Sequence, residues 1–100
     1  MIAAFSITPL GVGDSVGGLV AEVVGHVRAS GLRNETNAMF TNVEGEWDEV
    51  MALIKSSVML VAESAPRVSV VMKLDYRPGV ADGLTRKVES VEQHLRPRQP

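Results

Sequence analysis

The stretch that decides the fold is Phe40–Trp47, FTNVEGEW, near the middle of the chain. Alternate residues of a strand share one face, so Asn42, Glu44 and Glu46 are expected to point the same way. A strand whose outer face carries an amide and two carboxylates borders either water or a polar pocket. From Trp47 onward the apolar residues follow helical spacing, so the segment predicts a strand that runs directly into a helix.

On the C-terminal side, this helix should end before Pro66, because the residue preceding a proline avoids the helical region. Its predicted inward stripe comprises Trp47, Val50, Met51, Ile54, Val58 and Val61. Leu53 and Leu60 lie off the stripe and would be exposed in a monomer. Arg67–Arg77 alternates most clearly of all and predicts a strand. A last short helix carries one apolar stripe made of Leu84, Val88, Val91 and Leu95.

On the N-terminal side, Ile2–Thr8 alternates as a half-buried strand that Pro9 and Gly11 should stop. A helix follows, with a stripe made of Val16, Leu19, Val20, Val23, Val24 and Val27. Asn34–Glu46 then predicts two short strands joined by a turn near Asn37–Met39.

The resulting order is strand, helix, strand, strand, helix, strand, helix. This split βαβ arrangement predicts an α+β, ferredoxin-like βαββαβ sandwich with a four-stranded antiparallel sheet and an extra C-terminal helix. One hundred residues suffice for one core, so we expect a single domain over residues 1–100. A small aliphatic core with four aromatic residues is modestly stable, which favours oligomerisation.

Composition excludes several classes of function. The net charge of -2 and the mixed signs give no basic footprint for nucleic acid. The chain has no cysteine, which excludes disulfides and thiolate zinc sites. The opening residues, MIAAFSITPL, form neither a basic leader nor a segment long enough to span a membrane. We therefore expect a cytoplasmic protein with no nucleic-acid or membrane partner.

Two apparent motifs are weak. Gly11–Gly17, GVGDSVG, is placed like a dinucleotide-binding loop, but Asp14 at the helix start would repel a phosphate. His26 and His94 lack a second metal-spaced ligand on their own faces. No histidine is expected beside any of the candidate nucleophiles Ser6, Ser56, Ser57 and Ser69, so a serine–histidine mechanism is not indicated.

The sheet face turned away from the two main helices, here called the open face, is more informative. In a ferredoxin-like sheet the first strand lies between the third and the last. Ser6 and Thr8 should therefore lie between an acidic strand carrying Glu44 and a mixed strand carrying Lys73 and Asp75. A solvated face with paired charges is the plain interpretation. Because Ala4, Phe40 and Val71 also fall on this face, a ligand site or a subunit interface is favoured.

The pieces T-x-x-E-G-E (Thr41–Glu46) and L-D-Y-R-x-G (Leu74–Gly79) carry a resemblance that covers nearly the whole chain. The chain resembles a family of small cytoplasmic thiamine-binding proteins. The resemblance implies a ferredoxin-like fold, pairing through the sheets into homodimers and then homotetramers, and binding of thiamine or its hydroxymethylpyrimidine half. Taken with the open face, it suggests that the ligand-binding residues are Ser6, Thr8, Asn37, Thr41, Asn42, Glu44, Lys73 and Asp75.

The main hypothesis is non-catalytic binding of thiamine or a pyrimidine precursor at a subunit interface, with no other cofactor and no metal. The alternative is a small dimeric enzyme that uses Glu44, Glu46 or Asp75 as its base. A third possibility is an assembly module whose polar face is only an interface. Within the first hypothesis, either the aminopyrimidine is recognised by directional hydrogen bonds, or the acids act as counter-charges to the thiazolium.

Overall fold

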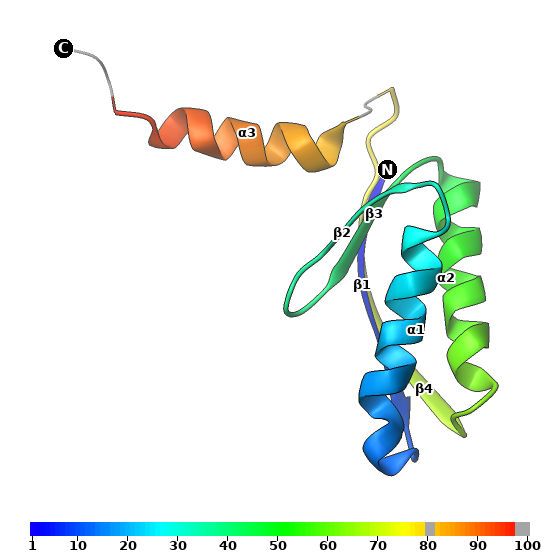
Figure 1. The fold of residues 1–100 in the computed structure, drawn as a ribbon. Coiled ribbons are helices and arrows are strands. Elements are labelled where there is room, and N and C mark those ends of the chain that lie inside the picture. The colour runs from blue at the N-terminus through cyan, green and yellow to red at the C-terminus, as the bar shows by residue number, and fades with distance from the viewer. Residues whose placement is uncertain (80–81, 98–100) are drawn as a thin grey trace.

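The computed structural model describes residues 1–79 and 82–97 and shows the predicted order of elements (Figure 1). Alternating or helically spaced apolar residues underlie the main elements, and their bounds differ from expectation by a few residues. The elements are β1 (Ile2–Leu10), a 3₁₀ turn (Gly13–Ser15), α1 (Val16–Arg28), β2 (Arg33–Thr36), β3 (Thr41–Glu44), α2 (Trp47–Ala62), β4 (Arg67–Asp75) and α3 (Gly83–Leu95).

The four strands form one antiparallel sheet in the order β2-β3-β1-β4. In the register of the sheet, Ala4 lies between Asn42 on β3 and Lys73 on β4, and Ile2 lies between Glu44 and Asp75. This arrangement confirms the predicted α+β, ferredoxin-like architecture with its additional C-terminal helix. It also confirms that β1 lies between the third and the last strand.

The hydrophobic core lies between the sheet and the pair α1 and α2, which cover the same face (Figure 1). Ala3, Phe5 and Ile7 point into it from β1, and Val43 joins them from β3. Their neighbours Ala4 and Ser6 are only half-buried on the open face. The period of two in β1 thus separates the core from the open face, as the sequence predicts.

The inward stripe of α2 differs from the prediction. Leu53, expected to be exposed, is buried, whereas Trp47, expected inside, is about half exposed. Trp47 instead meets Tyr76 edge to face, with ring centroids 6.0 Å apart. Because α2 packs on α1 as well as on the sheet, its buried arc is wider than a stripe that serves one neighbour. Glu46 does not extend β3 but caps α2, its N–H donating to Glu49.

β1 is longer than expected, because it continues through Pro9 to Leu10. β3 pairs with β1 only as far as Phe5, so from Ser6 onward β1 has a strand neighbour on one side alone, namely β4. Proline is tolerated in a strand with one open edge. The β2–β3 hairpin diverges from β1 at this point, and the two leave a gap in the sheet.

α3 does not pack on the body of the protein along its length. It runs out from the sheet on the side opposite α1 and α2 (Figure 1). Among the helices that the structure describes, none is long and apolar enough to cross a membrane.

Candidate functional site

Seven of the eight residues predicted to bind a ligand are divided between two clefts. Four of them border a cleft beside the β2–β3 hairpin, called here the hairpin cleft: Ser6, Thr8, Asn37 and Thr41. Three others border a cleft between the open face and α3, called here the open-face cleft: Asn42, Lys73 and Asp75. The remaining residue, Glu44, is buried beneath the start of α3. The structure therefore does not bring the predicted residues together in one place.

The hairpin cleft occupies the gap where the hairpin leaves β1, and its volume is about 210 Å³. One wall is α1, which contributes the apolar side chains of Val16, Val20, Val23 and Val24. The other walls are β1 and the hairpin, which add Phe40 and Met39. None of the described residues that line this cleft carries a charge.

Asn37 sets the shape of the hairpin turn. Its side-chain Oδ1 accepts hydrogen bonds from the backbone N–H groups of Met39 and Phe40, both at 2.9 Å. Its own N–H donates to the carbonyl of Phe40 at 3.0 Å. Asparagine commonly stabilises turns in this way. The side-chain oxygen is therefore engaged in holding the wall of the cleft.

The other polar groups of the hairpin cleft are available. Among the described residues, no hydrogen bond engages the hydroxyls of Ser6, Thr8 or Thr41, and β1 has no strand partner on this side beyond Phe5. Thr41 is nearly buried, on the face opposite to Asn42. Backbone and hydroxyl groups with free hydrogen-bonding capacity in an apolar wall are typical of a small-molecule site.

The open-face cleft is larger, about 540 Å³, and is lined by charged side chains as well as apolar ones. The sheet contributes Ile2, Ala4, Glu35, Asn42, Lys73, Leu74 and Asp75, and α3 contributes Leu84, Lys87 and Val88. Asp75 forms an ion pair with Lys87. Hydrogen bonding and charge attraction from Lys87 lower the pKa of the Asp75 carboxyl below its ordinary value.

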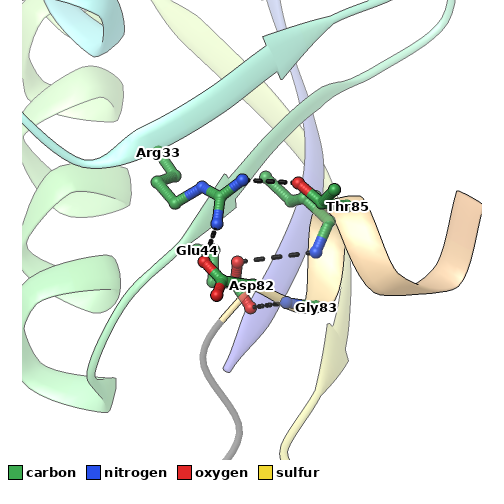
Figure 2. A network of polar contacts seen from close by, with 6 residues as sticks. Arg33, Glu44, Asp82, Gly83 and Thr85 are labelled. Atoms are coloured by element: carbon green, nitrogen blue, oxygen red, sulfur yellow. Dashed lines mark hydrogen bonds and ion pairs between the residues drawn. The ribbon is translucent and has the colours of Figure 1, made fainter. Parts of the chain in front are cut away.

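Glu44 fastens α3 to the sheet (Figure 2). Its Oε2 accepts a hydrogen bond from the backbone N–H of Gly83 at 2.6 Å, and its Oε1 accepts one from Leu84 at 3.4 Å. A carboxylate at this position satisfies N–H groups that the helix leaves free and complements the helix dipole. A Cβ on Gly83 would lie 2.8 Å from Glu44 Oε2 and 2.8 Å from Ile2 Cδ1, so only glycine allows this close approach.

Arg33 adds a second link between the hairpin and α3. Its guanidinium forms an ion pair with Asp82 and donates from Nη2 to Thr85 Oγ1 at 2.5 Å. The contacts of Arg33 and Glu44 together hold the first turn of α3 against β2 and β3.

The expectation that no serine lies beside a histidine is wrong. His26 Nε2 lies 2.7 Å from Ser56 Oγ, a contact that joins α1 to α2. Ser56 Oγ also donates to the carbonyl of Leu53 at 3.0 Å. The described residues contain no group of three histidine, aspartate or glutamate side chains placed to hold a metal ion.

Sequence reasoning missed the contribution of α1 to the hairpin cleft. It placed Val16 and Val20 in the core stripe, yet both are about two-fifths exposed and line the cleft. The predicted stripe of α1 carries six apolar residues. Together they span a wider arc of the helix than contact with one sheet face would bury. That excess width is the signal that could have indicated an apolar site beside α1.

Comparisons with known proteins give consistent results. A family model described as "Thiamine-binding protein" matches residues 3–92. A UPF0045 protein from Mycobacterium bovis is 55% identical over 96 residues, which cover 95% of this chain and 94% of that relative. A hypothetical protein of Methanocaldococcus jannaschii has a solved structure that superposes with a TM-score of 0.82 at 33% identity, covering 92% of this chain and 95% of that one.

A structure from Thermotoga maritima has the same fold, with a TM-score of 0.79 at 20% identity. It covers 90% of this chain and 96% of that one. That protein is described as a candidate thiamine biosynthesis or salvage protein.

Proposed function

The chain belongs to the thiamine-binding protein family, and we propose that it binds thiamine or its hydroxymethylpyrimidine half in the hairpin cleft without transforming it. The observation that carries this proposal is the uncharged hairpin cleft, whose hydroxyl groups have no partner among the described residues. In this role the protein carries, buffers or senses the ligand.

The chemistry of the hairpin cleft suits an aminopyrimidine. This ring offers an exocyclic amine as a donor and ring nitrogens as acceptors, and both pair with hydroxyl and backbone groups in the plane of the ring. Ser6 and Thr41 both line the cleft and supply such groups. Phe40 and Met39 supply an apolar, polarisable surface for the faces of the ring. A neutral ring needs no counter-charge, and none of the described lining residues supplies one.

The size of the hairpin cleft also favours the pyrimidine half of thiamine as the part that is bound. Sites that bury a complete drug-sized ligand have volumes of roughly 300–1,000 Å³. A cleft of about 210 Å³ suits one substituted ring, so the thiazolium would extend out of it. We therefore expect hydroxymethylpyrimidine to bind within about an order of magnitude of thiamine, and the isolated thiazole to bind poorly.

The two carboxylates that the sequence predicted as ligand-binding groups already have partners within the chain. Both carboxylate oxygens of Glu44 accept backbone N–H groups of α3, and Asp75 is paired with Lys87. A ligand that recruited them would have to break these contacts. This engagement favours the hairpin cleft over the open-face cleft as the ligand site. It also counts against the alternative enzyme, because no carboxylate base lines the hairpin cleft among the described residues.

Calorimetric titration with thiamine, hydroxymethylpyrimidine and the isolated thiazole tests the proposal. Thr41→Val keeps the shape of the side chain and removes the hydroxyl, so the affinity for thiamine should fall about tenfold. Asn42→Ala is the matched control, because Asn42 is the next residue of β3 and lines the other cleft. Its affinity should equal that of the wild type.

Three outcomes would contradict the proposal. If none of the three compounds bound, the proposed function would be excluded. A loss of affinity in Asn42→Ala with no loss in Thr41→Val would move the site to the open-face cleft. A new product, detected by mass spectrometry after incubation with thiamine, would make the protein an enzyme.

A further inference from the structure

The backbone of β1 borders the hairpin cleft at Ile7. Ile7 lines this cleft, and β3 pairs with β1 only as far as Phe5. In an antiparallel sheet, the N–H and C=O of one residue point toward the same neighbouring strand, and the direction alternates from residue to residue. The direction of Ile7 therefore determines which backbone groups face the cleft.

A hydrogen bond at the start of β1 determines this direction. The N–H of Gly45, directly after β3, donates to the carbonyl of Met1 at 3.1 Å. Met1 therefore points toward β3, and so does every second residue after it, including Phe5 and Ile7. Phe5 is the last residue of β1 that has a partner on β3. The N–H and C=O of Ile7 consequently point into the gap that the hairpin cleft occupies.

Two further observations agree with this direction. In the hairpin, the N–H of Asn37 donates to the carbonyl of Phe40 at 3.0 Å, so Phe40 points toward β2 and the next residue, Thr41, points toward β1. Thr41 is the residue that pairs with β1 at its last paired position. Pro9, two residues after Ile7, points the same way as Ile7. A proline there removes no hydrogen bond to β4, which explains how β1 continues through it.

The hairpin turn leaves Ile7 without a backbone partner. Extending the register of β1 and β3 by two residues would place Met39 opposite Ile7. Met39 lies in the turn, and its N–H donates to Asn37 Oδ1 at 2.9 Å. Since Ile7 points away from β4, its backbone groups take no part in the ladder with that strand either. Within the described part of the chain, Ile7 thus presents a free donor and a free acceptor side by side.

We propose, on the basis that the hairpin cleft binds the pyrimidine half of thiamine, that the backbone of Ile7 recognises the edge of the ring. The Ile7 carbonyl accepts a hydrogen bond from the exocyclic amine, and the Ile7 N–H donates to the adjacent ring nitrogen. The ligand class is therefore a flat heteroaromatic ring with an amine next to a ring nitrogen. Backbone groups away from water nearly always have a partner, so a ring without this edge would lose affinity.

The walls of the cleft suit a ring in this orientation. A ring that pairs with both groups of Ile7 continues the sheet in place of the missing strand and lies roughly in its plane. One face of the ring then turns toward α1, which covers that side of the sheet (Figure 1). The α1 wall is apolar there and includes Val20 and Val24. Hydrogen bonds at the edge and apolar contact on the face are typical of sites for such ligands.

Amide hydrogen exchange measured by NMR tests the proposal on the unaltered chain. In the free protein, the N–H of Ile7 should exchange at least about tenfold faster than that of Thr8, which points toward β4. Hydroxymethylpyrimidine at about a hundred times its Kd should slow exchange at Ile7 by at least about tenfold. The N–H of Leu32, exposed and outside the cleft, is the control and should slow by less than about twofold.

Two results of this measurement would overturn the inference. Slow exchange at Ile7 in the free protein would show that its N–H already has a partner, whether or not any compound binds. Unchanged exchange at Ile7, with a ligand that calorimetry shows to be bound, would exclude the backbone contact and leave the proposed function standing.

A proline variant removes the donor alone. Ile7→Pro deletes the N–H that faces the cleft and leaves the ladder with β4 intact, and Pro9 shows that β1 accepts proline in this direction. The affinity for hydroxymethylpyrimidine should fall by at least about tenfold. Ile7→Val is the matched control, because it trims the same buried side chain and keeps the N–H, so affinity should stay within about twofold. Equal affinity in Ile7→Pro and Ile7→Val would overturn the inference, and circular dichroism checks that both variants fold.

A ligand analogue tests the acceptor and the donor together. Replacing the exocyclic amine of hydroxymethylpyrimidine by an oxo group puts an acceptor where the amine donates and an N–H where the ring nitrogen accepts. This compound should bind at least about a hundredfold more weakly, because both groups of Ile7 would face groups of their own kind. Equal affinity of the amine and the oxo compound would show that the cleft does not recognise this edge.

Discussion

The two clefts border neighbouring residues of β1 and β3, and they differ in how their polar groups are engaged. In the hairpin cleft, the hydroxyls of Ser6 and Thr41 are neutral and have no partner among the described residues. In the open-face cleft and beneath α3, Asp75 and Glu44 already have partners within the chain. Free, neutral, directional groups suit the recognition of a small molecule, whereas engaged charges fix one element against another. The difference teaches that a cluster of charged residues in a sequence is not by itself a ligand site.

The largest expected effect comes from filling one cleft and leaving the other open. Val20→Trp on α1 would place an indole in the hairpin cleft, from a position that is already two-fifths exposed. Thiamine affinity should fall by at least about a hundredfold, because the volume for the ring is lost. Val88→Trp is the counterpart in the open-face cleft and should leave the affinity unchanged. Calorimetry on both variants measures the contrast, and equal losses would show that the two clefts are one functional site.

A smaller effect should follow Glu44→Gln. The amide cannot accept hydrogen bonds at both positions, so one backbone N–H of Gly83 or Leu84 would face another donor. We expect the free energy of unfolding to fall by about 1–3 kcal/mol, measured by denaturant unfolding at one fixed protein concentration. Thiamine affinity should stay within about twofold of the wild-type value.

Glu22→Gln, an exposed position on α1, is the control for Glu44→Gln and should change neither quantity. If Glu44→Gln lost thiamine binding while its free energy of unfolding stayed unchanged, Glu44 would belong to the ligand site. The distinction between the two clefts would then be wrong.

The smallest effect concerns the Asp75–Lys87 pair, which lies at the surface. The pKa of the Asp75 carboxyl is lowered in the folded state, so the pair stabilises the fold at pH values above the ordinary aspartate pKa of about 3.9. That contribution is lost as the pH falls through the folded value. An NMR titration of the Asp75 carboxyl should give a pKa below the ordinary value, and Lys87→Met should bring it back. An unchanged pKa in Lys87→Met would mean that the pair is not formed in solution.

Much of the fold could be predicted because its signals are local. Alternation in Ile2–Thr8 and Arg67–Arg77, and helical spacing between them, determine the element order, and the order determines the strand arrangement. The same patterns correctly placed Asn42 and Lys73 on the open face.

The partners of several candidate residues were harder to predict, because these contacts join distant parts of the chain. Glu44 contacts Gly83, which lies 39 residues away in the sequence, and His26 contacts Ser56, which lies 30 residues away. No pattern within either segment indicates such a partner. The burial of Leu53 likewise depends on the neighbouring helix α1, which a stripe counted on α2 alone does not include.

The distance in sequence between Glu44 and Gly83 also has a consequence for the order of folding. A helix of 13 residues is marginal in water by itself, because nucleation is costly. The carboxylate that caps α3 is in place only after β3 has joined the sheet. We therefore expect α3 to become helical last, after the strands that bear the hairpin cleft. During synthesis the chain would complete the hairpin cleft before it displays the exposed apolar residues of α3, which shortens the time in which incomplete chains can associate.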